Sequence, residues 1–202
     1  MVEKVLIATR NVAKKKEYQQ YFLEFLPAVR IVTLDEVDSY GAPTEDGKTF
    51  LENAYKKAVF YAKQTGLTTI GDDGGFEIDA LGGQPGVLSR RWPGYEASDQ
   101  ELVDLVFTKL RGVPKERRTA RFTTAAVVVK DTGEVVAKEQ GSVAGVIPKK
   151  PAPWIQKDFP FRAVLYFPKY KKYFQDLSEK EHQEINHRRA LIQKISIHLG
   201  NT

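Results

Sequence analysis

The chain has 202 residues, of which 42% are hydrophobic, and it carries a formal net charge of +5 with no cysteine. This length is enough for a buried core, and the missing thiols exclude disulfides and thiolate metal sites and favour a reducing compartment. The first apolar run, residues 5–8, is too short for a secretory segment, and no later run is long enough to span a bilayer. We therefore expect a cytoplasmic protein that does not enter a membrane. The basic balance gives mild support to phosphate-bearing partners.

The N-terminal part of the chain alternates between strand and helix patterns. Residues 5–9 form an apolar run that predicts a buried strand. The charged stretch that follows predicts a helix, because inward-facing side chains recur in it at three- and four-residue steps: Lys14, Tyr18, Phe22 and Phe25. A second short strand is expected at residues 31–33.

Helix starts are marked by a repeated capping signature. Thr49 and Glu52 have the spacing at which a hydroxyl and a carboxylate each satisfy a backbone donor, which predicts a helix over residues 50–65 that ends at Gly66. The signature occurs twice more, before a helix through Leu110 and before one long C-terminal helix ending at Gly200: Ser98 with Glu101, and Ser178 with Glu181.

The middle of the chain is rich in β-forming residues. Residues 120–130 and 135–147 predict two strands, joined by a hairpin turn at residues 131–134. Prolines then mark a loop, and residues 161–167 predict one more strand. Because strands and helices alternate early and a hairpin comes late, we expect an α/β fold with a mixed sheet that carries helices on its faces. No repeat or linker divides the sequence, so residues 1–202 are expected to form a single domain.

The most informative segment begins with two adjacent carboxylates, Asp72 and Asp73, directly after a strand-like run at residues 68–71. Six of the 15 glycines lie between Gly71 and Gly86, so the backbone there can turn sharply and approach a ligand closely. We interpret the residues after the acidic pair as a turn. Acidic groups at the end of a strand suit a cation that is shared with an anionic substrate. A solvated Asp-Gly turn is the alternative for this segment taken alone.

Three further polar clusters accompany this segment. Residues 9–14 join the first strand to the first helix, where backbone N–H groups and a lysine form a phosphate cradle or, alternatively, an ordinary helix cap. Asn53 and Lys57 are four residues apart on the predicted inward stripe of their helix, where a lysine either balances phosphate charge or extends to solvent. Residues 186–189 place His187 beside two arginines, a combination suited to gripping a purine.

Together these segments resemble the house-cleaning nucleoside triphosphate pyrophosphatases of the inosine triphosphate pyrophosphatase type. The family's T-G-N-x-x-K corresponds to residues 9–14, and its E-T-G-x-T-F-x-E-N-A-x-x-K-A corresponds to residues 45–58. Its D-D-S-G-L-x-V-D-A-L-G-G-x-P-G-V-x-S-A-R-Y corresponds to residues 72–92, and its S-H-R to residues 186–188. The motifs keep their order, so the resemblance covers nearly the whole chain.

The resemblance implies an elongated α/β fold of two lobes around a cleft, with a strongly twisted mixed sheet, usually in a homodimer. It implies Mg²⁺-dependent cleavage of the α–β phosphoanhydride of a nucleoside triphosphate substrate, which yields a nucleoside monophosphate and pyrophosphate. The typical substrates are inosine and xanthosine triphosphates, so the implied role is to clear non-standard purine nucleotides from the nucleotide pool.

Residue matching then assigns roles to positions of this chain. The implied metal ligands are Glu45, Asp73 and Asp72. The implied catalytic residues are Asp73, which orients or deprotonates the attacking water, and Lys57, which neutralises phosphate charge. The implied phosphate contacts are Thr9, Arg10, Asn11, Lys14 and Gly74. The implied contacts to the base are Phe159, Phe161, Arg162, His182, His187 and Arg188.

The chain also departs from the family pattern. Arg10 replaces a glycine of the phosphate loop, and Gly74 replaces a serine beside the acidic pair. The family's base-binding loop, G-F-G-Y-D-P-I-F, is represented only by residues 158–165, in which Arg162 stands where an aspartate would face the purine. His182 takes the place of a nucleotide-contacting lysine. A guanidinium only donates hydrogen bonds whereas a carboxylate accepts them, so we hypothesise that hydrolysis is kept while base preference shifts towards bases that offer acceptors.

Two readings from other functional classes remain open at this point. A nucleotide-binding protein that has lost catalysis would explain Arg10 and Gly74, but it does not explain why Glu45, Asp73 and Lys57 are kept. The basic aromatic tract at residues 167–174 would suit single-stranded nucleic acid. We favour instead a surface loop whose aromatic rings pack inward, and therefore do not expect a nucleic-acid partner.

Overall fold

The computed structural model describes residues 4–201, which divide into two compact units. Unit 1 runs up to Gly74 and adds Thr124–Gly141 and the chain from His187 onward, whereas unit 2 comprises Gly75–Thr123 and Ser142–Asn186. Three long strands have residues in both units: β3 (Thr69–Ile78), β5 (Thr119–Val129) and β6 (Val135–Val146). That the two units form a single domain stays a prediction. No described helix has the length and apolar character that a membrane crossing needs.

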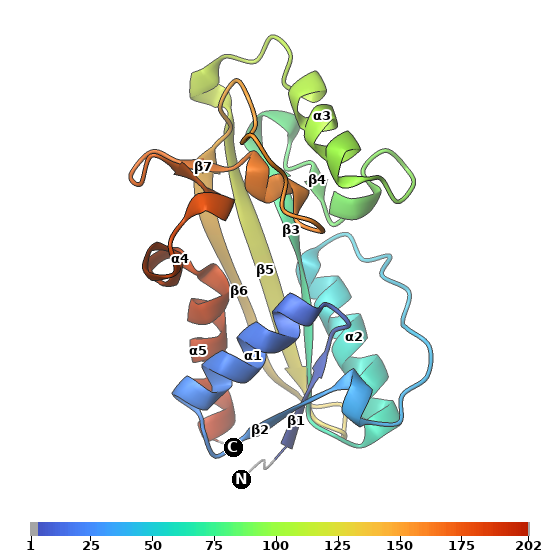
Figure 1. Cartoon of the computed structure of the whole chain (residues 1–202). Coiled ribbons are helices and arrows are strands. Elements are labelled where there is room, and N and C mark those ends of the chain that lie inside the picture. Colours follow the sequence, from blue (N-terminus) through green and yellow to red (C-terminus); the bar gives the residue numbers. More distant parts are fainter. Residues whose placement is uncertain (1–3, 202) are drawn as a thin grey trace. The chain divides into compact units, whose positions relative to one another are not determined.

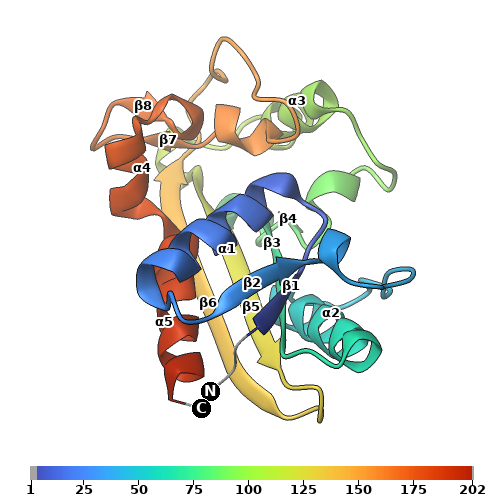
Figure 2. The same cartoon turned by 60° about the horizontal axis from the view of Figure 1, so that its bottom comes forward.

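Unit 1 is built on parallel strands. Strand β1 (Lys4–Ala8) pairs in parallel with β2 (Arg30–Thr33) on one side and with β3 on the other, and β5 and β6 extend the order to β2-β1-β3-β5-β6 (Figure 2). Helix α1 (Val12–Phe25) connects β1 to β2, and α2 (Phe50–Thr65) lies between β2 and β3. The sheet is therefore mixed and flanked by helices, which confirms the predicted α/β class.

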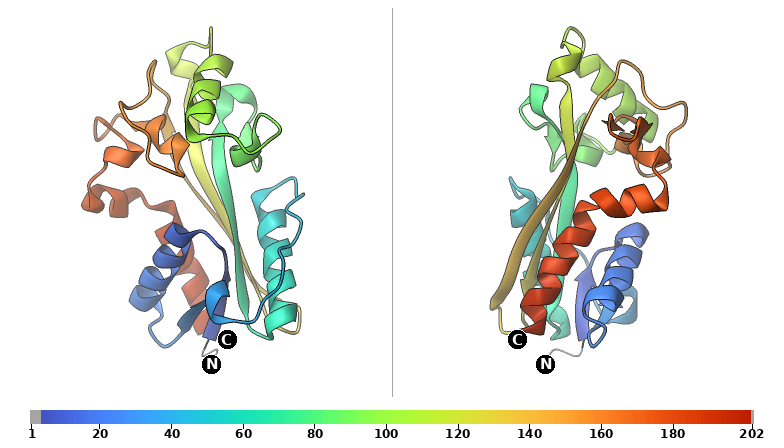
Figure 3. Two further views of the ribbon diagram at one scale, coloured as in Figure 1. Left: turned by 45° about the vertical axis from the view of Figure 1, so that its right-hand side comes forward. Right: turned by 90° about the vertical axis from the view of Figure 1, so that its left-hand side faces the viewer.

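The helices of unit 1 cover both faces of its sheet. Helix α1 packs against α5 (His187–Gly200) on one face, and α2 covers the other face (Figures 1 and 3). Alternate residues of β1 follow this division: Val5 and Ile7 join the core under α1 and α5, while Leu6 and Ala8 join the core under α2. A parallel strand buried on both faces needs such a continuous apolar run, and this is the pattern that predicted it.

Helix α2 begins and ends where the sequence predicts. The Thr49 hydroxyl accepts from the N–H of Glu52 at 3.1 Å, and Gly66 ends the helix with φ of 65°. The Glu52 carboxylate, however, accepts from the N–H of Lys48 at 2.6 Å, one residue earlier than a reciprocal capping box requires. The boxes at Ser98 and Ser178 are reciprocal.

The predicted turn after Asp72 and Asp73 is wrong. The acidic pair and the two glycines that follow lie inside β3, which continues to Ile78. The glycine before the pair serves close packing instead of a turn, because a Cβ on Gly71 would lie 1.9 Å from the carbonyl oxygen of Ala54 in α2. A glycine inside a strand often marks such a close approach of another backbone.

Unit 2 carries the remaining sheet and its own core. The pairs β4 (Pro85–Gly86) with β3, β7 (Tyr166–Phe167) with β6, and β8 (Lys172–Tyr173) with β7 are antiparallel. Helix α3 (Asp99–Lys109) contributes Leu102 and Val106 to a core that also contains Phe76, Phe161 and Leu165. The strand predicted at residues 161–167 is wrong in its first part, because Pro160–Ala163 form a 3₁₀ turn and only β7 is extended.

The C-terminal region departs from the single helix that was predicted. Helix α4 (Glu179–Ile185) ends at Asn186, whose φ of −68° and ψ of 98° are extended, and α5 begins at His187. Before α4, the basic aromatic tract packs inward as predicted, since Phe167 and Phe174 are each only 5% exposed. Lys172 of this tract forms an ion pair with Glu181 at 2.8 Å, so its charge is already compensated within unit 2.

Candidate functional site

The predicted acidic site lies at the carboxyl end of β1 in unit 1. Ala8, the last residue of β1, pairs with Gly71, so Asp72 and Asp73 stand just beyond the end of that strand. Helix α1, which follows β1 in the chain, and helix α2, which precedes β3, cover opposite faces of the sheet (Figure 3). In open α/β sheets, ligands bind outside the carboxyl ends of the strands, at the point where the connections from two neighbouring strands run to opposite faces of the sheet.

Asp72 and Asp73 point to opposite faces of the sheet. Side chains alternate along a strand, so Asp72 shares the face of Ile70, whose side chain lies in the core under α1 and α5. Asp73 shares the face of Gly71, which packs on α2. The neighbouring carboxylates therefore have separate sets of partners.

Asp72 is fully buried and surrounded by donors. Its carboxylate forms an ion pair with the Lys14 ammonium and accepts from Arg188 Nε at 3.4 Å and from the Tyr18 hydroxyl at 3.1 Å. Burial alone would raise the pKa of Asp72, but the charges of Lys14 and Arg188 outweigh it and hold that pKa well below its usual value. Asp72 also contributes, after burial, to the raised pKa of Tyr18. With both oxygens engaged, Asp72 acts as the counter-ion of two cations.

Arg188 ties α5 to the same network. Its guanidinium donates to Glu17 Oε2 at 2.5 Å and to the Thr124 hydroxyl at 3.2 Å, and that hydroxyl also contacts His187 Nε2 at 3.0 Å. Burial would lower the pKa of Arg188, but the charges of Asp72 and Glu17 raise it above its usual value. Arg188 and His187, which were predicted to contact the base, thus have protein partners within unit 1.

The opposite face brings together Asp73, Asn53, Lys57 and Glu45. The Lys57 ammonium lies 2.9 Å from Glu45 Oε2 and 3.6 Å from Asp73 Oδ1. The Asn53 side-chain amide donates to Asp73 Oδ2 at 3.0 Å. Both helix residues are buried, as their predicted place on the inward stripe of α2 requires. Three of the predicted site residues therefore converge around one point.

Charges on this face are less well balanced than around Asp72. Burial raises the pKa of Asp73 above its usual value, and the nearby Lys57 and Lys14 charges only partly offset that effect. Burial would lower the pKa of Lys57, but Asp73 and Glu45 together raise it. Asp73 thus gains from any additional positive charge placed beside it.

The oxygen atoms on this face fit the divalent ion that the resemblance implies. The carboxylates of Glu45 and Asp73 already face one cationic group, the Lys57 ammonium, which stands in for a positive charge between them. Among residues 4–201, no cluster of three or more histidine, cysteine or acidic side chains is arranged around a common point. Two carboxylates are nonetheless sufficient for Mg²⁺, which keeps several waters and takes its remaining oxygens from substrate phosphates.

The predicted phosphate loop forms the entry into α1. Asn11 caps the helix by accepting from the N–H of Lys14 at 3.0 Å, and its own N–H donates to the Thr9 hydroxyl at 3.2 Å. The Arg10 guanidinium turns to the carbonyl oxygen of Gly41 at 2.8 Å, on the loop that carries Glu45. Gly74 is a half-buried residue of β3 at the end of the first segment of unit 1.

The predicted base contacts Phe159, Arg162 and His182 lie together in unit 2. The Arg162 guanidinium is stacked 4.1 Å above the Phe159 ring and 5.2 Å from the Phe174 ring, and it donates to Gln156 Oε1 at 3.2 Å. His182 meets Phe174 edge-on at 4.5 Å between ring centres. Phe161, in contrast, stacks on Phe76 in the core of unit 2, and this packing does not support its predicted role as a base contact.

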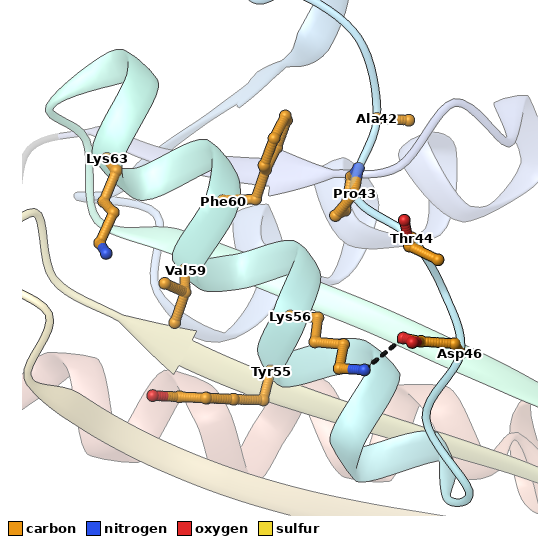
Figure 4. Close-up of a pocket in the computed structure, with 9 residues that line it drawn as sticks. All are labelled: Ala42, Pro43, Thr44, Asp46, Tyr55, Lys56, Val59, Phe60 and Lys63. Atoms are coloured by element: carbon orange, nitrogen blue, oxygen red, sulfur yellow. Dashed lines mark hydrogen bonds and ion pairs between the residues drawn. The ribbon is translucent and has the colours of Figure 1, made fainter.

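A separate groove of about 580 Å³ lies in unit 1 on the outer side of α2 (Figure 4). Its walls are the loop from Ala42 to Asp46 and the outward residues of the helix, including Tyr55 and Phe60. Figure 4 shows the ion pair between Lys56 and Asp46 across it. None of the predicted site residues lines this groove, so it is not the acidic site described above.

Comparison with known proteins identifies the family of this chain. The sequence model of the Ham1 family matches residues 5–197. This chain belongs to the Ham1 family. It is 35% identical to the dITP/XTP pyrophosphatase of Desulfotalea psychrophila over 195 residues, covering 96% of this chain and 84% of the relative. It is 34% identical to the dITP/XTP pyrophosphatase of Desulforamulus reducens, covering 95% of this chain and 92% of the relative.

A solved Ham1 structure shares the fold. The HAM1 protein of Coxiella burnetii superposes with a TM-score of 0.85 at 28% sequence identity, and the match covers 100% of both chains. Membership of the Ham1 family agrees with the use of a divalent metal and a nucleotide substrate.

Four residues around Asp72 and Asp73 were given no functional role from the sequence. Asn53 was placed on the inward stripe of its helix but given no role, and Tyr18 was recognised only as one of the inward-facing side chains of the first helix. Glu17 and Thr124 complete the pairing of Arg188. The i, i+3 spacing places Glu17 on the same helix face as Lys14 but does not indicate its pairing with Arg188, and Thr124 gave no signal within a Thr- and Val-rich strand.

Proposed function

We propose that this chain hydrolyses non-standard purine nucleoside triphosphates, such as inosine and xanthosine triphosphates, to the monophosphate and pyrophosphate, with Mg²⁺ as cofactor. The observation that carries the proposal is the convergence of the Glu45 and Asp73 carboxylates on one cationic group, the Lys57 ammonium. The names of the related dITP/XTP pyrophosphatases support the choice of substrate.

The acidic face of unit 1 supplies the chemistry in this proposal. Glu45 and Asp73 would hold the ion, which when bound neutralises phosphate charge and makes a water more acidic. Asp73 would orient the attacking water and accept its proton, since its carboxylate is only partly exposed and is fixed by Asn53. Lys57 balances the negative charge that develops on the phosphates, because its pKa is raised and it stays protonated at neutral pH.

The phosphate chain is proposed to bind at the start of α1. The backbone N–H groups of the first turn and the helix dipole favour an anion there. Arg10 adds a cation that is held 2.8 Å from the Gly41 carbonyl, on the loop that carries Glu45. Lys14 lies one turn further along the helix, and its ammonium is held in place by an ion pair with Asp72.

Asp72 is proposed to position cations instead of holding the metal. Its oxygens are occupied by Lys14, Arg188 and Tyr18 on the face opposite Asp73. Asp72 therefore fixes the Lys14 ammonium and anchors α5 through Arg188.

The stack formed by Phe159, Arg162 and Phe174 is proposed to set base preference. A guanidinium that lies over two rings offers its N–H groups at its edge, and these groups only donate. Bases that present an acceptor to this edge, such as the O6 carbonyl of hypoxanthine or xanthine, are then favoured over bases that present an amino group there. This departs from the aspartate that the family pattern places at Arg162.

Pyrophosphate release from a panel of ribo- and deoxyribonucleoside triphosphates, each with and without Mg²⁺, tests the function. We expect Mg²⁺-dependent release with a preference among purine substrates. Tight binding of a triphosphate without cleavage would favour the catalytically impaired binding protein instead.

Replacing Arg162 tests the base preference separately. In Arg162→Asp we expect the ratio of kcat/KM between an acceptor-rich base and a base with donors to change by about 10-fold or more, because the hydrogen-bonding group is inverted. Unchanged ratios across the panel would contradict a role for Arg162 in recognising the base.

We also propose that the protein is a cytoplasmic homodimer. Light scattering after size-exclusion chromatography should then give twice the 22.8 kDa chain mass.

A further inference from the structure

Asn53 makes two hydrogen bonds that connect the two acidic segments of unit 1. Its Nδ2 donates to Asp73 Oδ2 on β3 at 3.0 Å, and its Oδ1 accepts from the backbone N–H of Gly47 at 2.8 Å. Gly47 is two residues after Glu45 on the irregular loop before α2. Asn53 is only 2% exposed, so both bonds are shielded from competing water.

The chemistry of the two partners requires an amide at this position. A backbone N–H can only donate and an ionised carboxylate can only accept, so one group must accept on one side and donate on the other. Aspartate would keep the bond to Gly47 and lose the bond to Asp73. Residue 47 is equally constrained, because a Cβ there would lie 2.5 Å from Asn53 Oδ1.

We propose that Asn53 is a positioning residue that sets the spacing between the Glu45 carboxylate and the Asp73 carboxylate, and so the affinity of the site for a divalent cation. The proposal rests on the proposed function of these two carboxylates as metal ligands. Asn53 itself contacts neither the ion nor the substrate. It acts by holding Asp73 in one orientation and by holding the Glu45 loop at a fixed distance from β3.

The loop needs such a connection because it has no regular structure of its own. Between the 3₁₀ turn that ends at Glu36 and the start of α2 at Phe50, the chain forms neither helix nor strand. A second amide anchors the far end of this loop: Gln64 Oε1 accepts from the N–H of Tyr40 at 3.0 Å, and Gln64 Nε2 donates to the Tyr40 carbonyl at 3.1 Å. Gln64 is therefore a matched control, since it also ties the loop to α2 but has no bond to Asp73.

Three variants separate the two bonds of Asn53. Asn53→Ala removes both, Asn53→Asp keeps the acceptor for Gly47 but removes the donor to Asp73, and Gly47→Ala displaces the amide without changing it. Each is compared with Gln64→Ala and with the unmodified protein. The readouts are Mn²⁺ binding without nucleotide, followed by electron paramagnetic resonance, the Mg²⁺ concentration for half-maximal pyrophosphate release, and the melting temperature.

We expect Asn53→Ala and Asn53→Asp to weaken Mn²⁺ binding and to raise the half-saturating Mg²⁺ concentration by about 10-fold or more, as loss of a ligand's supporting hydrogen bond typically does. Gly47→Ala should weaken binding in the same direction, and its combination with Asn53→Ala should add little further loss, because both act on one connection. Gln64→Ala should bind Mn²⁺ like the unmodified protein.

Unchanged Mn²⁺ binding in a folded Asn53→Ala or Gly47→Ala variant would overturn the proposal, as would an equal loss in Gln64→Ala. These results are distinguishable from failure of the proposed function. If the unmodified protein releases pyrophosphate in an Asp73-dependent way while Asn53 variants keep normal metal binding, only the positioning role fails. If the unmodified protein binds no Mn²⁺, the metal site itself is wrong.

Discussion

The two adjacent carboxylates of β3, Asp72 and Asp73, lie on opposite faces of the sheet in unit 1 and have opposite pKa shifts. On the face of α1 and α5, Asp72 is enclosed by Lys14, Arg188 and Tyr18, and its pKa is held well below the usual value. On the face of α2, Asp73 has one amide donor and an ammonium 3.6 Å away, and burial raises its pKa. One peptide bond therefore separates a satisfied carboxylate from an under-compensated one.

This difference separates structural from chemical roles. A carboxylate whose pKa is lowered by its partners stabilises the folded chain, because ionisation is favoured by folding. A carboxylate whose pKa is raised by burial costs stability at neutral pH, and such groups are found where a site awaits a ligand or a proton. We therefore assign stability to the Asp72 face and the reaction to the Asp73 face.

The largest effect is expected on catalysis, from a substitution on the Asp73 face. Asp73→Asn should lower kcat for pyrophosphate release by on the order of 10³-fold, because it removes both the proton acceptor and a charged metal ligand. Its melting temperature should equal or slightly exceed that of the unmodified protein, since an unfavourable buried charge is lost. Near-normal turnover in this variant would take Asp73 out of the mechanism.

The next largest effect concerns the structural side. Asp72→Asn should lower the free energy of unfolding by about 3 kcal/mol, because it leaves the Lys14 and Arg188 cations without their shared counter-charge. Denaturant titration of this variant beside Asp73→Asn measures the contrast directly. Equal stabilities for the two variants would contradict the division of roles.

A smaller effect is expected from the outer partner of Arg188. Glu17→Gln should lower the free energy of unfolding by about 1.5 kcal/mol, since a charge-assisted bond at 2.5 Å becomes a neutral one while Asp72 still compensates Arg188. The same denaturant titration checks this value. A loss as large as that in Asp72→Asn would place the main anchor of α5 at Glu17.

The pH dependence of stability sharpens the comparison further. Because the folded-state pKa of Asp72 lies below its unfolded value, its contribution is present at neutral pH and is lost as pH falls below about 4. The unmodified protein should lose up to about 1.4 kcal/mol per pH unit more than Asp72→Asn in that range. The pKa of Asp73 is raised by folding, so Asp73 does not contribute to this loss of stability at low pH. The Asp73→Asn variant should therefore lose stability below about pH 4 as the unmodified protein does. Parallel acid curves for all three proteins would show that Asp72 is not a stabilising ion.

Much of the fold could be predicted because local signals and packing agree. The capping residue Thr49 and the stop at Gly66 mark both ends of α2, and the apolar run of β1 matches its burial on both faces. The break at Asn186 could not be predicted, because the capping box at Ser178 marks a helix start and nothing in the pattern marks an end. The strand predicted from residue 161 failed because those aromatic residues serve the core from a 3₁₀ turn.

The sequence predicted that Glu45, Lys57 and Asp73 lie together, but it did not predict that Asp72 and Asp73 face opposite sides of the sheet. The sequence places Glu45, Lys57 and Asp73 in recognisable motifs, and the structure brings them together. The glycines after Asp73 indicated a turn, which hid the strand geometry that separates Asp72 from Asp73. Once the segment is known to be extended, the alternation of side chains alone requires the two carboxylates to face opposite ways.

The most direct measurement is Mn²⁺ binding without nucleotide to four proteins: the unmodified chain, Glu45→Gln, Asp73→Asn and Glu17→Gln. The account predicts one bound ion per unmodified chain, loss of that ion in both the Glu45 and Asp73 variants, and normal binding in the Glu17 variant from the opposite face. Undiminished binding in Asp73→Asn and Glu45→Gln would contradict the assignment of a divalent cation to these two carboxylates.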